Sequence, residues 1–79
     1  MTPSAMAETG LDLSGLKCPL PALKTRKALA RLGAGDRLVV TTTDPMAAID
    51  IPHLVQQTGD VLEGHSASGA RLVFRIVKV

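Results

Sequence analysis

The residue most suited to covalent chemistry in this chain is Cys18, its only cysteine, which begins the segment Cys18-Pro19-Leu20-Pro21. Proline is favoured in the first turn of a helix, because the N–H that it lacks would have no acceptor there. We therefore expect Cys18 to be the N-cap of a helix whose first residue is Pro19. Its thiolate would accept a hydrogen bond from the Leu20 N–H and lie at the positive end of the helix dipole. Both effects predict a pKa below that of a free cysteine, and hence a nucleophilic sulfur.

The residues around Cys18 also restrict what this thiol can do. Dithiol redox proteins carry a second cysteine three positions later, whereas this chain has Pro21 there and no other cysteine. Any covalent reaction must therefore involve another molecule, through a carried sulfur atom, a mixed disulfide or an acyl group. A single cysteine is most often an inert core residue. Lys17 and the two prolines argue against that alternative, because they fit poorly inside a strand or helix.

Composition predicts one small folded domain. The chain has 79 residues, 46% hydrophobic and 20% charged, and Phe74 is its only aromatic residue, so we expect an aliphatic core. Residues 1–8 are expected to form a flexible N-terminal tail and residues 9–79 a single domain. One cysteine, no lysine or arginine among the first ten residues and no long apolar run predict a cytoplasmic protein without a membrane span.

The elements that must position Cys18 are predicted in the order βαβαββ. Strands are expected at residues 11–13, 37–43, 61–67 and 71–79, and helices at residues 19–32 and 44–59. We also expect a kink or restart near residues 50–52 and a hairpin turn at Ser68-Gly69. Helical crossovers make the first strands parallel, and the final hairpin adds an antiparallel strand. The prediction is an α/β fold: a two-layer sandwich with a mixed four-stranded sheet and both helices on one face.

Charged residues on the first helix suggest a surface for a partner. Lys24, Lys27 and Arg31 share one side of this helix, and with Lys17 they form a candidate basic surface for an acidic protein. An ordinary solvated helix face explains the same residues equally well.

Other polar residues receive plainer interpretations. Asp44 and Asp50 are expected to be helix caps or turn residues, with a second possibility that they shape the rim near Cys18. His53 and His65 lack the spacing of a metal site, so no metal is expected.

Three pieces of this sequence together resemble one protein family. These pieces are the segment Gly15 to Pro21 with the basic helix that follows it, Asp44-Pro45, and Asp50-Ile51-Pro52. With them the chain resembles the TusA sulfur-carrier family, also called SirA-like, over about residues 9–79. The resemblance implies a sheet order of 1-2-4-3 and a Cys18 that accepts sulfane sulfur as a persulfide and passes it on. Pro19, Leu20 and Pro21 would position this cysteine. No cofactor is needed for such a transfer.

The resemblance also implies partners. The sulfur donor would be a cysteine desulfurase or a rhodanese-type enzyme, and acceptors would serve tRNA thiolation, molybdenum cofactor assembly or sulfur oxidation. The family motif does not distinguish these pathways, nor does it exclude selenium as the element carried.

Two functions of other classes stay open from the sequence. An RNA-binding module is compatible with the basic helix, but a net charge of +2 and the absence of Trp and Tyr leave weak electrostatics and no stacking platform for bases. A regulatory adaptor, in which Cys18 is only structural, would have a slowly reacting thiol.

Overall fold

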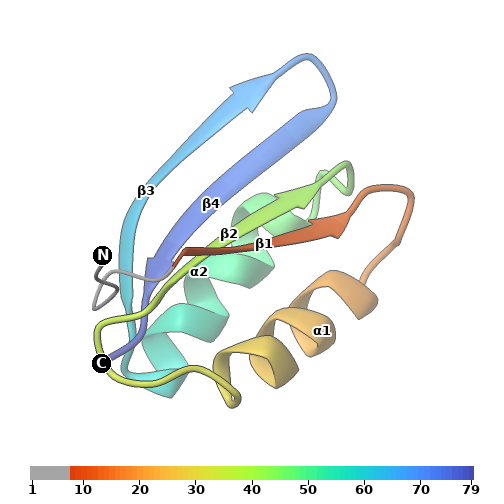
Figure 1. Cartoon of the computed structure of the whole chain (residues 1–79). Coiled ribbons are helices and arrows are strands. Elements are labelled where there is room, and N and C mark those ends of the chain that lie inside the picture. The colour runs from red at the N-terminus through yellow and green to blue at the C-terminus, as the bar shows by residue number, and fades with distance from the viewer. Residues whose placement is uncertain (1–7) are drawn as a thin grey trace.

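The computed structural model describes residues 8–79, which form two helices against one face of a four-stranded sheet (Figure 1). The elements are β1 (Glu8–Leu13), α1 (Leu20–Leu29), β2 (Arg37–Thr42), α2 (Ala47–Thr58), β3 (Val61–Ser68) and β4 (Arg71–Val77). The predicted βαβαββ order and α/β class are confirmed. Residues 1–7 of the predicted tail lie outside the described residues, so that prediction stays a prediction, while Glu8 is the first residue of β1.

The sheet has the order β1-β2-β4-β3, as the resemblance implied. β1 and β2 are parallel because α1 crosses between them, and β4 is antiparallel to both β2 and β3. In the parallel pair Leu13 lies opposite Thr42, so both strands end at the same edge of the sheet. The loops that follow β1 and β2 therefore lie next to each other, and the first of these loops carries Cys18.

The core lies between the sheet and the two helices. On β2, Leu38, Val40 and Thr42 are buried, as the alternation of that strand predicts. Leu29 of α1 and Ile51 of α2 are buried against this face. Phe74, the only Phe, Tyr or Trp of the chain, is also buried, and the rest of the hydrophobic core is aliphatic. This packing holds both helices, and with them both loops, in fixed positions on the sheet.

Several local predictions differ from the structure. The helices are shorter than expected, since α1 ends at Leu29 and not at residue 32, and α2 begins at Ala47 and not at residue 44. Strand β1 is longer than expected, since it begins at Glu8. α1 begins at Leu20 and not at Pro19. The restart expected near residues 50–52 is wrong, because α2 continues through Pro52; a proline in the second turn removes only one intrahelical hydrogen bond. The hairpin loop is Gly69-Ala70 and not Ser68-Gly69, since Ser68 pairs with Arg71. Gly69 has a φ of +62°, which glycine adopts readily.

Neither helix of residues 8–79 is long and apolar enough to cross a membrane.

Candidate functional site

Asp44 ties together the two loops at the carboxyl ends of β1 and β2. Its Oδ2 accepts the Cys18 N–H at 2.6 Å, and its Oδ1 accepts the Met46 N–H at 3.1 Å. The first contact anchors the backbone of Cys18, and the second stabilises the turn that leads into α2. The N-cap of α2 is Met46 and not Asp44, so Asp44 is a turn residue, which is the other role expected for it. A further link joins the Gly15 N–H to Thr43 Oγ1 at 2.9 Å. Because Asp44 is only 8% exposed, it holds Cys18 to the body of the domain from within.

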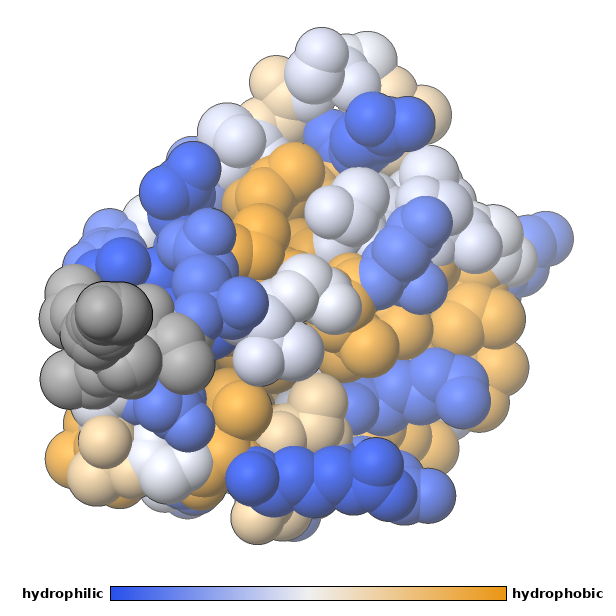
Figure 2. All heavy atoms as spheres, in the orientation of Figure 1, coloured by the Kyte–Doolittle hydropathy of each residue, from blue (hydrophilic) through white to orange (hydrophobic). Residues whose placement is uncertain are grey.

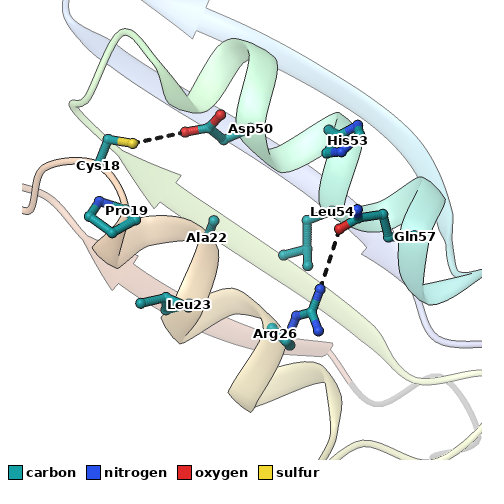
Figure 3. A pocket seen from close by; sticks show the side chains of 9 residues that line it. All are labelled: Cys18, Pro19, Ala22, Leu23, Arg26, Asp50, His53, Leu54 and Gln57. Atoms are coloured by element: carbon teal, nitrogen blue, oxygen red, sulfur yellow. Dashed lines mark hydrogen bonds between the residues drawn. The ribbon is translucent and has the colours of Figure 1, made fainter.

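The Cys18 side chain is exposed and points toward α2. Its thiol donates a hydrogen bond to Oδ2 of Asp50, with 3.2 Å between sulfur and oxygen (Figure 3). The expected exposure of Cys18 is therefore confirmed, and the inert core alternative does not apply. Asp50 lies one turn into α2, so the second helix supplies the group that contacts the sulfur.

The predicted environment of the sulfur is wrong in two respects. The N-cap of α1 is Pro19, which places Cys18 one residue before the cap. The Leu20 N–H, expected to bond the sulfur, instead donates to the Lys17 carbonyl oxygen at 2.9 Å. The thiol thus lacks the backbone donor that would have stabilised its anion.

The pKa of the Cys18 thiol is raised above its usual value. The hydrogen bond to Asp50 is the main cause, because it favours the protonated thiol. Desolvation and the negative charges of Asp50 and Asp44 act in the same direction. The start of α1 alone predicts a lowered pKa for Cys18, whereas both carboxylates that raise it come from residues after β2.

A groove of about 380 Å³ opens beside Cys18, between α1 and α2. Figure 3 labels the nine residues that line it: Cys18 and Asp50 lie at one end, and Arg26 and Gln57 at the other. At that far end the Arg26 guanidinium donates to Gln57 Oε1 at 3.3 Å. The volume is that of a small-ligand site, and Cys18 is one of its lining residues.

From the sequence, the α2 side of this groove was anticipated only at Asp50, as a second possibility. Asp50 is not a cap or turn residue but lies inside α2, and it does line the groove next to Cys18. Asp50, His53, Leu54 and Gln57 follow the spacing i, i+3, i+4, i+7, which places them on one face of a helix. That spacing was available as a signal, but it could be connected with Cys18 only once the two loops were known to be neighbours.

The predicted basic surface is divided in the structure. Lys24, Lys27 and Arg31 are exposed, as expected, but they line a separate groove of about 220 Å³ together with Leu11 of β1. The two grooves share no lining residue, and only Lys17 adjoins Cys18 in the chain. Figure 2 shows hydrophilic side chains lying across the region of α1, with hydrophobic surface between them.

Exposed apolar side chains lie at the starts of α1 and α2, the two helices that form the groove beside Cys18. Within residues 8–79 six large hydrophobic residues are exposed, and four of them lie at the starts of α1 and α2: Leu20, Leu23, Met46 and Ile49. Pro19 is exposed and Pro21 is buried, so the two prolines present one ring to solvent and pack the other. Exposed apolar side chains at the starts of both helices therefore accompany the carboxylate that contacts the sulfur.

The described part of the chain holds no group of three or more His, Cys, Asp or Glu residues that would suit a metal ion. The site that the structure brings together is instead a thiol, a carboxylate and an open groove. The thiol of such a site can take part in an exchange reaction with an S–S bond of an incoming molecule.

Comparison with known proteins identifies the family. The family model described as Sulfurtransferase TusA matches residues 9–78. The sulfur carrier protein TusA of Allochromatium vinosum is 40% identical over 68 residues, which cover 86% of this chain and 90% of that protein. A candidate sulfur carrier protein of Neisseria meningitidis is 52% identical over 52 residues, 66% of this chain and 70% of the relative. Together with the 1-2-4-3 sheet, these matches show that the chain belongs to the TusA family of sulfur carriers.

Proposed function

We propose that Cys18 accepts a sulfane sulfur atom from a donor protein, holds it as a persulfide and passes it to an acceptor protein. The observation that carries this proposal is the position of the sulfur: it is exposed, it faces an open groove, and it belongs to the only cysteine of the chain. No second thiol of this chain can discharge the persulfide as an internal disulfide. Membership of the TusA family supports the same function.

The proposed loading step is a simple exchange. The Cys18 thiolate attacks the terminal sulfur of a donor persulfide, a new S–S bond forms on Cys18, and the S–S bond of the donor breaks. The electron pair of the broken bond stays on the inner sulfur of the donor, which takes up a proton in place of the one that Cys18 loses. One thiol and one persulfide are consumed and one of each is formed, so no oxidant or cofactor is required. Unloading is the same exchange with Cys18 as the leaving group.

Residues next to Cys18 are proposed to position it and to contact partners. The packed ring of Pro21 and the cap at Pro19 fix the chain on either side of Leu20, whose side chain is 43% exposed. Lys17 is placed to contact a partner that reaches the sulfur. Lys24, Lys27 and Arg31 would meet such a partner only if it extends over the second groove. Charge reversal at Lys24 and Lys27 tests this: slower uptake from a protein donor supports it, and an unchanged rate removes these residues from docking.

The partners that we propose are those implied by the family resemblance. A cysteine desulfurase or a rhodanese-type enzyme would load Cys18, and acceptors would serve tRNA thiolation, molybdenum cofactor assembly or sulfur oxidation. We propose a cytoplasmic location on the sequence grounds given above.

A regulatory adaptor is the second candidate function, and one observation favours it. The raised pKa of Cys18 makes the thiol of the free protein a slow nucleophile near neutral pH, as expected of a structural cysteine. The two functions differ in their response to Cys18→Ser, since an adaptor retains its partner's response and a sulfur carrier loses it.

The proposed function is tested by the intact mass of the protein after incubation with a cysteine desulfurase and cysteine. We expect an added mass of one sulfur atom that a reductant removes. Cys18→Ser serves as the matched control and should gain nothing. A wild-type protein that gains no sulfur from either a desulfurase or a rhodanese-type donor would contradict the proposal.

A further inference from the structure

The contact between Cys18 and Asp50 is the one polar interaction of the sulfur in the described part of the chain. It joins residues from different elements, the loop before α1 and the first turns of α2, so their approach is a feature of the tertiary fold. The Cys18 backbone is fixed separately by Asp44. With the backbone held on one side and the thiol on the other, the sulfur has a defined direction, toward the groove between the helices (Figure 3).

The carboxylate of Asp50 can still accept hydrogen bonds or form an ion pair with a partner. Within residues 8–79 its carboxylate forms no ion pair, and the thiol is its only side-chain hydrogen-bond partner. A carboxylate can accept about four hydrogen bonds. Since Asp50 is half-buried at the mouth of the groove, a molecule that approaches the sulfur also reaches the free side of this carboxylate.

Four other charged or titratable residues lie around the Cys18–Asp50 pair, one each from the loop after β1, α1, the loop after β2 and α2: Lys17, Arg26, Asp44 and His53. None of them forms an ion pair with Asp50 within the described residues. Arg26 is bonded to Gln57 at the far end of the groove, and Asp44 adds a second negative charge near the sulfur. The immediate field at the sulfur is therefore negative, which favours an incoming cation and opposes the thiolate.

We infer that Asp50 is a positioning residue that accepts the Cys18 S–H and aims it into the groove, and that a cationic group on the sulfur donor releases the thiol by pairing with the carboxylate. This inference rests on the proposed function, because it describes how the same sulfur becomes reactive. When the cation pairs with Asp50, the S–H bond loses its acceptor and the thiolate becomes easier to form. The thiolate then attacks the donor persulfide as described above, and the proton that Cys18 loses is balanced by the one that the inner sulfur of the donor takes up.

The residues around Cys18 and Asp50 also indicate which side chains the sulfur donor carries. The exposed side chains of Leu20, Leu23, Met46 and Ile49 lie at the starts of the two helices that carry Cys18 and Asp50. A donor that covers these apolar groups excludes water from the pair, and this strengthens an ion pair with Asp50. We therefore expect a donor segment in which the reactive cysteine has apolar neighbours and one lysine or arginine.

Small thiol reagents of different charge test the inference without a protein donor. Three methanethiosulfonates are used, carrying a trimethylammonium, a neutral methyl or a sulfonate group, and each rate is divided by that of a small neutral thiol. At low ionic strength we expect the wild type to favour the cation over the neutral reagent by up to about fivefold, and the neutral reagent over the anion by a similar factor. Asp50→Asn should reduce both ratios, leaving the part that Asp44 causes.

The pH profile of the neutral reagent supplies a second readout that a purely structural role would not move. The wild-type midpoint should lie above that of the small thiol, and Asp50→Asn should lower it and speed the reaction near neutral pH. Glu8→Gln removes a carboxylate at the opposite end of β1 and should leave midpoint and ratios unchanged. Asp50→Ser serves as a second variant, and because each charge ratio is measured within one protein, a modest loss of stability does not affect it.

The outcomes separate this inference from the proposed function. If Asp50→Asn has the wild-type midpoint and the wild-type charge ratios, the role of Asp50 is refuted even if Cys18 is loaded with sulfur by a donor. If these reagents behave as expected but no donor ever loads Cys18, the proposed function fails and the electrostatic control of the thiol stands.

Discussion

Replacing Asp44 by alanine should loosen the connection between the two loops that build the site. The side chain is 8% exposed and accepts two backbone N–H groups, from Cys18 at 2.6 Å and from Met46 at 3.1 Å. Asp44→Ala leaves both donors without their acceptor and loosens the turn before α2. The effect should therefore appear in the stability of the whole domain and in the position of Cys18.

The magnitude follows from the two bonds. Hydrogen bonds to charged groups contribute about 1.5–3 kcal/mol each, and water will replace part of the loss at this partly open position. We expect Asp44→Ala to lower the free energy of unfolding by about 3 kcal/mol. Domains of this length have total stabilities of roughly 4–12 kcal/mol, so the variant should still fold. Asp44→Asn retains one carbonyl oxygen and should lose about half as much.

Urea unfolding followed by far-ultraviolet circular dichroism measures this difference, because the chain has no Trp or Tyr for fluorescence. A loss of this size moves the midpoint of Asp44→Ala down by at least about 1 M. Glu8→Gln, at an exposed position, is the control and should stay within about 0.5 kcal/mol of the wild type. If Asp44→Ala also stays within that range, the account of how the two loops are joined is wrong.

Three further predictions concern the stability of the domain: the packing of α2, the end of α2, and a hydrogen bond at the end of β1. Ile51→Ala, at a fully buried position of α2, should cost about 2–5 kcal/mol of unfolding free energy, and a loss below 1 kcal/mol in urea unfolding would show that α2 is not packed as described. Gly59→Ala should cost about 1–2 kcal/mol, because Gly59 ends α2 with a φ of +81°; a thermal midpoint equal to that of the wild type would argue against this conformation. The pKa of Asp12 is lowered, chiefly by its hydrogen bond with the Ser14 side chain, so this bond stabilises the fold above the usual carboxyl range and is lost as the pH falls through the lowered value. The stability difference between wild type and Asp12→Asn should therefore shrink on acidification, and a difference that grows instead would contradict the assignment.

Much of the fold could be predicted from local patterns. Alternation in β2 predicts its buried face correctly, and helical spacing in α1 places Lys24, Lys27 and Arg31 on an exposed side, because burial of one face determines which residue types occur there. The sheet order came only from the family resemblance, since no local pattern shows that β4 lies between β2 and β3. Element ends were less accurate: Pro19 is compatible with either the cap or the first turn, and Pro52 is tolerated inside α2.

The site was predicted less completely, and the reason is the distance between its parts along the chain. Cys18 was identified from its own neighbours, but the group that contacts its sulfur comes from α2. The expected effect of the α1 start was outweighed by Asp50 and Asp44, so the direction of the pKa shift was reversed. Only the parallel pairing of β1 with β2 brings these carboxylates to Cys18.

The most direct test of the central claim is the mass of the tryptic peptide Cys18–Lys24 after reaction with a sulfur donor and blocking with a neutral alkylating reagent. The account predicts that this peptide carries one extra sulfur atom between Cys18 and the label, and that treatment with a reductant before blocking removes it. Recovery of Cys18 only as the directly alkylated thiol, from protein that circular dichroism shows to be folded, would contradict the account.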